Sequence, residues 1–278
     1  MKRSGRIATM IKILSDHPSK MFQLSEFSQH FHAAKSTISE DLKAARSILD
    51  ETGLGKIETI PGAGGGVRFL PWISDEECLH IQENLCHLIS DPSRLLGGGF
   101  LYTSDIMFHP DRTLEMAAIF ARKFRETNPD YVATIETKGL PLALMTARLL
   151  HIPAIVVRRE TRISEGSTIS INYFSGSANR IQKISLSKKA VHAGSRALII
   201  DDFMRAGGSL KGVRELLDES EMQVCGIGVA IASVQPKHKK IDHYTSLVYL
   251  SEIDEEPQRI SVFPNHQIFE NTLVNTPY

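Results

Sequence analysis

Few cysteines and no long apolar run limit the kinds of protein this chain can be. Its 278 residues include three cysteines, Cys78, Cys86 and Cys225, and no Cys-x-x-Cys pair. An odd, scattered set supports neither a disulfide framework nor a structural zinc site, so we expect reduced thiols. No run of membrane-spanning length and no signal-peptide core occurs, so we expect a cytoplasmic protein with no membrane partner.

Net charge is also lacking, because 32 Lys and Arg residues balance 32 Asp and Glu residues. The balance is uneven along the chain: residues 1–74 carry ten basic and seven acidic side chains, and the rest has an acidic excess. A mildly basic front favours a polyanionic partner, although an ordinary solvated surface gives similar numbers. The length predicts two domains, for which we expect the bounds 1–72 and 73–278.

A stretch near residue 200 combines a buried strand, two carboxylates and a glycine turn. The apolar run Ala197–Ile200 predicts a parallel strand that ends at Asp201 and Asp202, and the spacing of Leu210–Glu219 predicts a helix. Between them, Gly-Gly-Ser209 lets backbone N–H groups converge at the positive end of that helix. We therefore expect a cradle for a sugar phosphate, with the amides and the Ser209 hydroxyl around a monoester and the carboxylates on a diol or Mg²⁺.

A second turn of the same kind precedes it. The pattern predicts a strand over Tyr131–Ile135, a helix over Leu140–Leu150 and a strand over Ala154–Val157, which is a right-handed βαβ unit. The turn Glu-Thr-Lys138-Gly139 lies at the carboxyl end of the first strand, where Lys138 either faces an anion or is freely solvated. Alternating strands and helices from residue 130 onward predict an α/β domain with a mainly parallel sheet.

The front of the chain predicts three short helices followed by a hairpin. Helical spacing covers residues 4–14, 24–31 and 33 to about 52, with a cap near Ser25, and alternating strands flank a glycine turn between residues 56 and 70. This order is typical of a winged-helix DNA-binding domain, with a small helical interaction or dimerisation domain as the alternative. The residues expected to meet DNA are Arg3, Lys35, Ser36, Thr37, Ser39, Lys43 and Arg68.

The stretch Leu-Ile-Ile-Asp-Asp-Phe-Met-Arg-Ala-Gly-Gly-Ser resembles the signature of type I phosphoribosyltransferases, in which Ala-Thr-Gly-Gly-Thr follows Asp-Asp and two variable residues. Arg205 and Ala206 depart from that signature, adding a cation and removing a hydroxyl. The resemblance implies that the carboxylates hold ribose hydroxyls, the glycine turn holds a 5′-phosphate, and Glu-Thr-Lys-Gly meets a pyrophosphate. The effector-binding residues it implies are Lys138, Gly139, Asp201, Asp202, Phe203, Arg205, Ala206, Gly207, Gly208 and Ser209.

Three further segments complete the interpretation of the sequence. Residues 161–186, with strands expected at Ile169–Phe174 and Ile181–Leu186, resemble by position the hood that closes over the ligand in these transferases. For Phe100-Leu101-Tyr102 we expect core packing rather than stacking on a ligand. After Val234 no base-binding segment is evident, and Gln-Pro-Lys-His-Lys-Lys has no predicted role.

Together, a winged helix ahead of a transferase-like domain resembles the purine operon repressors of Gram-positive bacteria. The resemblance implies a homodimeric transcriptional repressor that binds double-stranded operator DNA, needs no cofactor, has no catalytic residue or metal site, and is released by phosphoribosyl pyrophosphate, with Mg²⁺. It also implies guanosine tetraphosphate as a corepressor at the same site. The alternatives are an active purine phosphoribosyltransferase with a regulatory N-terminal domain, and a ligand-gated interaction protein that does not bind DNA.

Overall fold

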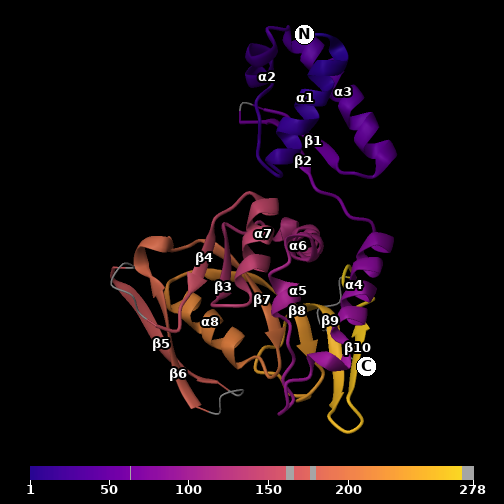
Figure 1. Cartoon of the computed structure of the whole chain (residues 1–278). Helices are drawn as coiled ribbons and strands as arrows, with labels where there is room; N and C mark the ends of the chain where they lie inside the picture. The colour runs from indigo at the N-terminus through magenta and orange to yellow at the C-terminus, as the bar shows by residue number, and fades with distance from the viewer. Residues whose placement is uncertain (63, 161–165, 176–179, 271–278) are drawn as a thin grey trace. The chain divides into compact units, whose positions relative to one another are not determined.

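The computed structural model describes residues 1–62, 64–160, 166–175 and 180–270, and the chain divides into two compact units (Figure 1). Unit 1 comprises residues 1–75 with 148–151, and unit 2 comprises residues 76–147 with 152–278. Within the described ranges, no helix has both the length and the apolar character that a membrane crossing requires.

Unit 1 consists of three helices and a two-stranded antiparallel hairpin, as the sequence predicts. The elements are α1 (Arg3–Asp16), α2 (Leu24–Phe31), α3 (Lys35–Thr52), β1 (Lys56–Ile60) and β2 (Gly66–Leu70). The N-cap of α2 is Gln23, which forms a capping box with Glu26 and precedes Ser25, near which the cap was expected, by two residues. One apolar stripe of each helix enters a common core with the hairpin, whose buried members include Met10, Leu14, Phe27, Ile38, Leu42 and Val67.

The hairpin of unit 1 is extended by the segment before α2. The backbones of Phe22 and Val67 exchange hydrogen bonds of 2.9 and 2.8 Å, which places this segment antiparallel to β2. A Cβ atom added to Gly66 would lie 2.3 Å from the Phe22 carbonyl oxygen, so the close pairing requires glycine there. Gly66 therefore serves strand pairing, beside the turn that precedes it.

Unit 2 is built on a six-stranded sheet in the order β10-β9-β8-β7-β3-β4, parallel except for β10. Its strands are β3 (Tyr131–Ile135), β4 (Ala154–Val157), β7 (Arg196–Met204), β8 (Gln223–Ser233), β9 (Thr245–Asp254) and β10 (Arg259–Pro264). Its helices are α4 (Asp75–Ile89), α5 (Ser104–Met107), α6 (Pro110–Phe124), α7 (Leu140–Leu150) and α8 (Gly208–Glu219). The mainly parallel α/β fold is confirmed, whereas β10 was not predicted.

Helices cover both faces of this sheet. Ala197 and Ile199 of β7 belong to the same buried cluster as Leu210 and Val213 of α8. The next residue of β7, Ile200, lies on the other face of the sheet. Its side chain and that of Phe120 on α6 both lie next to Gly228 of β8. Because successive side chains of a strand point to opposite faces, α8 and α6 lie on opposite sides of β7.

A separate antiparallel pair, β5 (Thr168–Ser175) and β6 (Arg180–Ser187), packs against α8 (Figure 1). The two strands predicted here are thus confirmed, while residues 161–165 and 176–179 of the expected hood lie outside the described residues. A Cβ atom added to Gly212 of α8 would lie 2.9 Å from the Tyr173 ring and 3.3 Å from Ile184. Glycine on α8 therefore lets this hairpin pack directly on the helix.

The strand β7 continues beyond the point where the sequence predicts its end. Asp201, Phe203 and Met204 pair with Val229, Ile231 and Ala232 of β8, so the prediction that the strand ends at Ile200 is wrong. The physical reason is that β8 is long enough to continue the ladder past the two carboxylates. The acidic pair therefore lies on extended, hydrogen-bonded backbone, and the turn itself begins after Met204.

Candidate functional site

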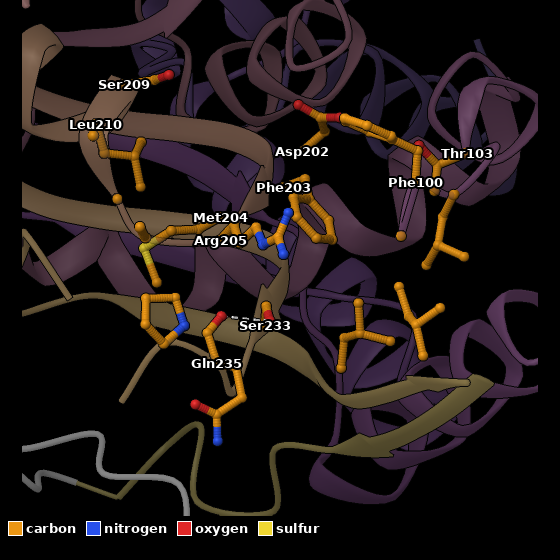
Figure 2. Close-up of a pocket in the computed structure, with 18 of the residues that line it drawn as sticks. Phe100, Thr103, Asp202, Phe203, Met204, Arg205, Ser209, Leu210, Ser233 and Gln235 are labelled. Carbon is orange, nitrogen blue, oxygen red and sulfur yellow. Dashed lines mark hydrogen bonds between the residues drawn. The ribbon is translucent and has the colours of Figure 1, made fainter. Parts of the chain in front are cut away.

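A cavity of about 710 Å³ lies at the carboxyl end of β7 and gathers most of the predicted effector-binding residues (Figure 2). Eight of them line it, namely Lys138, Asp202, Phe203, Arg205, Ala206, Gly207, Gly208 and Ser209. Gly139 and Asp201 do not line it, although each is next in sequence to a residue that does. Other walls come from residues 99–103 and from β9, so segments from distant parts of the chain meet here. This is the position at which open α/β sheets bind ligands.

Residues Arg205–Ser209, here called the phosphate loop, lead from β7 into α8. Gly207 caps the helix with a φ of +79°, a left-handed conformation that a side chain disfavours. Its carbonyl accepts the Lys211 N–H at 2.9 Å, which starts the helical pattern and leaves the preceding N–H groups free of helical partners. A helix N-terminus with a cationic side chain, Arg205, beside it is suited to bind an anion.

The two neighbouring aspartates differ in what they can offer a ligand. Burial raises the pKa of Asp201 well above its usual range, and the nearby Asp202 carboxylate raises it further. Burial also raises the pKa of Asp202, but Asp201 and Lys138 act in the opposite direction. Asp201 therefore retains its proton more strongly, and Asp202 is the carboxylate that faces the cavity. The Asp202 N–H donates to Asp201 Oδ1 at 3.0 Å, which fixes the arrangement of the pair.

Residues Glu136–Gly139, here called the diphosphate loop, follow β3 and contribute Lys138 to the cavity. The acid of this loop is occupied elsewhere: Glu136 accepts the Arg159 N–H at 2.7 Å and the Arg158 guanidinium at 3.3 Å. Glu136 is therefore paired with these two arginines. The charged side chain that this loop contributes to the cavity lining is that of Lys138. The peptide between Glu136 and Thr137 is cis.

Apolar side chains from several segments also line the cavity. Phe100, Leu101, Phe203, Leu250 and Ile253 all contribute to its lining. Phe100 is 54% exposed, so the expectation that it packs in the core is wrong. The reason is the preceding run of three glycines with left-handed φ, residues 97–99, which turns the chain before Phe100. An aromatic wall of this kind can stack on a planar base.

A hydrogen-bonded network links the β5–β6 hairpin to both loops. The Tyr173 hydroxyl donates to Gln182 Oε1 at 2.7 Å and accepts from Arg159 at 3.0 Å, and it lies 3.5 Å from Ser209 Oγ. The Arg159 guanidinium also lies 3.5 Å from the Glu136 carbonyl of the diphosphate loop. Sequence inspection missed this network, because Tyr173 and Gln182 appear there only as members of alternating strands.

Sequence reasoning also missed the segment behind the phosphate loop. Gln235 and Pro236 line the cavity, the Lys239 ammonium donates to the Arg205 carbonyl at 2.6 Å, and the Lys240 N–H donates to the Ala206 carbonyl at 2.8 Å. No local pattern in this polar segment indicates these contacts, because they depend on how β8 and β9 are connected.

In unit 1, most of the predicted DNA-binding residues lie on the solvent face of α3. Lys35, Ser36, Ser39 and Lys43 are exposed, and Thr37 is half-buried. Lys35, Ser39 and Lys43 follow one another at four-residue spacing and Ser36 lies beside them, so these four form one polar helix face apart from the buried residues Ile38, Leu42 and Ala45. A polar face of this kind on the last of three helices is available to a DNA groove.

The two predicted arginines of unit 1 are ion-paired. Arg3, 63% exposed, contacts the buried carboxylate of Asp41 on α3 at 3.2 Å, and Arg6 contacts the same carboxylate at 2.7 Å. Arg68 is half-buried and pairs with Glu58 across the hairpin at 2.5 Å. Arg3 thus extends from a fixed ion pair at the start of α1, and Arg68 is neutralised by its neighbour on β1.

Protein ligands for a metal are sparse at this site. Among the described residues, no three His, Cys, Asp or Glu side chains are grouped so as to hold an ion. The cavity lining itself offers two carboxylates, those of Asp202 and Glu252, beside the loops for anions. Such a donor set matches Mg²⁺ that is carried mainly by a ligand's own phosphates, since Mg²⁺ commonly uses one or two carboxylates beside phosphate oxygens.

The fold and the cavity define a phosphoribosyltransferase-type domain that follows a small helical unit. The family model of the phosphoribosyl transferase domain matches residues 103–263. Among solved structures, adenine phosphoribosyltransferase from Thermoanaerobacter pseudethanolicus superposes with a TM-score of 0.50 at 16% identity, covering 60% of this chain and 98% of that chain. The enzyme from Giardia lamblia superposes with a TM-score of 0.50 at 17% identity, covering 74% and 98%. These likenesses establish the fold alone.

Sequence relatives identify the family. The model of the bacterial purine repressor N-terminal domain matches residues 2–71. The purine biosynthesis transcriptional repressor PurR of Bacillus subtilis is 40% identical over 94% of this chain and 92% of that protein. The purine biosynthesis transcriptional activator PurR of Lactococcus lactis is 37% identical over 94% and 97%. The chain belongs to the PurR family of purine biosynthesis transcriptional regulators. A xanthine phosphoribosyltransferase of Oenococcus oeni is 30% identical over 58% of this chain and 81% of that enzyme.

Proposed function

We propose that this protein is a cytoplasmic, homodimeric repressor of purine biosynthesis genes, which binds double-stranded operator DNA and is released by phosphoribosyl pyrophosphate. The observation that carries the proposal is that one cavity brings together the phosphate loop, Asp202 and Lys138 in a chain whose relatives are transcriptional regulators. The ligand's three polar parts, a monoester, a diol and a diphosphate, each have a matching group there.

In the proposed complex, the 5′-phosphate lies in the phosphate loop at the N-terminus of α8. The ribose hydroxyls hydrogen-bond Asp202, which Asp201 supports from behind, and the diphosphate meets Lys138. Magnesium would arrive with the diphosphate, use Asp202 as a protein ligand and screen the repulsion between phosphate oxygens and the carboxylate. Arg205 adds positive charge to this site, which raises affinity for a polyanion in its ground state without assisting group transfer.

Guanosine tetraphosphate is proposed as a corepressor that competes for the same cavity. It carries phosphates for the two loops and a planar base that could stack on Phe100 or Phe203, which both line the cavity. Two ligands that share a site can have opposite effects only if each favours a different conformation of the protein. The β5–β6 hairpin, hydrogen-bonded to both loops through Tyr173 and Arg159, is the element that we propose to respond to the difference.

DNA binding is proposed for unit 1. The exposed face of α3, with Lys35, Ser36, Ser39 and Lys43, would enter a major groove, and Arg3 would contact the backbone beside it. Arg68 would contact the backbone only by sharing its guanidinium between Glu58 and a phosphate. A homodimer would present two such helices to two half-sites. One relative is named a repressor and another an activator. Repression, rather than activation, is therefore part of what we propose.

The experiment is a gel shift on the promoter of a purine biosynthesis operon from the same genome. The full-length protein should shift this DNA, Mg²⁺–phosphoribosyl pyrophosphate should release it, and guanosine tetraphosphate should oppose the release. In vitro transcription from the same promoter should fall when the protein is added. An increase would assign the activator role, and an unchanged shift at saturating phosphoribosyl pyrophosphate would refute the effector.

The enzyme alternative is tested in parallel with purine bases, xanthine included because of the Oenococcus oeni relative. Incubation with phosphoribosyl pyrophosphate and each base should yield no nucleotide by liquid chromatography. Turnover that the D202A variant abolishes would replace the purely regulatory role with a catalytic one.

A further inference from the structure

We infer that Lys239 is a positioning residue that holds the phosphate loop from behind in the conformation that receives a phosphate monoester, an inference that rests on the proposed ligand site. Lys239 lies in the polar segment between β8 and β9 and does not line the cavity. Its effect on a ligand would therefore pass through the loop that it holds.

Two carbonyl groups converge on the Lys239 ammonium. Nζ donates to the carbonyl of Arg205 in the phosphate loop and to the carbonyl of Ser233 at the end of β8, both at 2.6 Å. Lys239 thus ties the loop to a strand of the central sheet. Hydrogen bonds from a charged donor are stronger than those between neutral groups, so this tie fixes the position of the Arg205 carbonyl.

Neighbouring residues extend the same support. The Lys240 N–H donates to the Ala206 carbonyl at 2.8 Å. A Cβ atom added to Gly207 would lie 3.5 Å from the backbone nitrogen of Ile241, whose side chain is buried. Residues 239 and 240 therefore hydrogen-bond two successive residues of the phosphate loop, and Ile241 lies near the third.

The orientation of these carbonyls determines where the loop's N–H groups point. The peptide after Arg205 and the peptide after Ala206 are trans, and in a planar trans peptide the N–H points opposite to the carbonyl. Because both carbonyls are directed to residues 239 and 240, the N–H groups of Ala206 and Gly207 point away from that segment. Ala206 and Gly207 both line the cavity, so these donors are set for a bound anion.

The charge of Lys239 adds to this geometric effect. Burial, with a contribution from Arg205, lowers the pKa of Lys239 to about 8. Burial and Arg205 therefore disfavour the protonated form of Lys239. A phosphate bound near Lys239 and Arg205 would offset this effect, because a nearby anion favours the protonated form. Ligand affinity should consequently decline as the pH rises through the pKa of Lys239.

The test compares K239M with the matched variant K237M. Lys237 is an exposed lysine of the same segment, so its replacement removes the same charge from the neighbourhood. Calorimetry would use ribose 5-phosphate, which needs the phosphate loop, and inorganic pyrophosphate, which needs the diphosphate loop. K239M should weaken ribose 5-phosphate binding about tenfold or more and leave pyrophosphate binding unchanged, whereas K237M should alter neither beyond about twofold.

A pH series with K239R separates positioning from mere packing. Arginine stays protonated, so K239R should bind ribose 5-phosphate as wild type does below pH 8 and should lack the loss of affinity above it. Equal ribose 5-phosphate affinities in K239M and K237M would overturn the inference, as would a wild-type profile that is flat across pH 8. Equal losses for both ligands in K239M would overturn it too, because they would indicate general damage to the domain.

Two further variants test the proposed ligand site itself by calorimetry. If S209A and D202A bind phosphoribosyl pyrophosphate as wild type does, the site itself is wrong and the role of Lys239 falls with it. If those variants lose affinity while K239M retains it, the site stands and the role of Lys239 alone is refuted.

Discussion

Gly139 lies so close to the Asp201 carboxyl that an added Cβ atom would be 2.5 Å from Oδ1. The same Cβ would lie 2.7 Å from Oγ1 of Thr134, a buried hydroxyl that lacks a hydrogen-bond partner among the described residues. The diphosphate loop and the acidic pair of β7 are therefore in direct contact, although they are far apart in the sequence. Both obstacles belong to buried groups that cannot swing away, so glycine is required at position 139.

Replacing Gly139 by Ala should move the diphosphate loop away from β7. We expect G139A to lose about 1–3 kcal/mol of unfolding free energy through overpacking and to bind pyrophosphate more weakly than wild type. Urea unfolding and calorimetry measure the two effects. The matched control is G64A, because nothing lies within 4 Å of the Cβ position there. Wild-type values for both quantities in G139A would contradict the contact.

The raised pKa of Asp201 predicts a pH-dependent stability. Because the folded state binds this proton more tightly than the unfolded chain, unfolding free energy should fall as pH rises from about 3.8 toward the folded-state pKa. Each unit of pKa difference corresponds to about 1.4 kcal/mol. The D201N variant keeps a neutral side chain, so its urea-unfolding free energy should fall less over that range. Parallel pH profiles for the two proteins would show that Asp201 is not the group responsible.

Replacement of Asp202 should act on the ligand rather than on the fold. Asp202 lines the cavity beside Lys138, so D202A should bind Mg²⁺–phosphoribosyl pyrophosphate at least about tenfold more weakly. Its DNA complex should consequently resist release by the ligand. Calorimetry measures the affinity, and D218N, which alters an exposed acid on α8, serves as the control. Unchanged affinity in D202A would remove this residue from the site.

Much of the fold was predictable because its signals are local. The strand Tyr131–Ile135 and the helix Leu140–Leu150 agree with β3 and α7 residue for residue, since apolar periodicity and the proline in the first helical turn mark both. The phosphate loop was equally visible, because its carboxylates, glycines and serine are contiguous in sequence. The eight predicted residues that line the cavity come from segments of this kind.

What escaped prediction depends on partners elsewhere in the chain. The length of β7 is set by its ladder with β8, and β10 is a short edge strand in which the alternating Arg-Ile-Ser-Val runs into Phe-Pro. Phe100 and Lys239 reach the site only through the placement of residues 97–99 and of the segment after β8. Neither residue differs in sequence from an ordinary core aromatic or surface lysine, so only the tertiary structure reveals them.

The exposed lysines of α3 should contribute to DNA binding through phosphate contacts. Replacing Lys35 or Lys43 by Ala should weaken binding across DNA sequences and lower the slope of log affinity against log salt by about one per lost contact. Fluorescence anisotropy over a salt series measures this slope. The control is K12A, since Lys12 on α1 is exposed and pairs with Asp16 four residues on. A slope unchanged from that of wild type would place these lysines away from the phosphates.

Arg3 and Arg6 share the carboxylate of Asp41, yet they should differ in what their loss costs. Arg6 is 14% exposed and Arg3 is 63% exposed, while Asp41 is buried. Removing Arg6 leaves a buried charge poorly compensated, so R6M should lose about 3 kcal/mol of unfolding free energy, whereas R3M should lose less than about 1 kcal/mol.

For DNA affinity the order of the two arginines should be reversed, with the loss of Arg3 having the larger effect. R3M should retain the fold and weaken operator binding, because the exposed Arg3 guanidinium at the start of α1 is the one that a phosphate can reach. D41N should resemble R6M in urea unfolding, and E40Q, next to it on the exposed side of α3, should resemble wild type. Equal stability of R3M and R6M would show that Asp41 does not distinguish them, and normal operator binding by R3M would remove Arg3 from the interface.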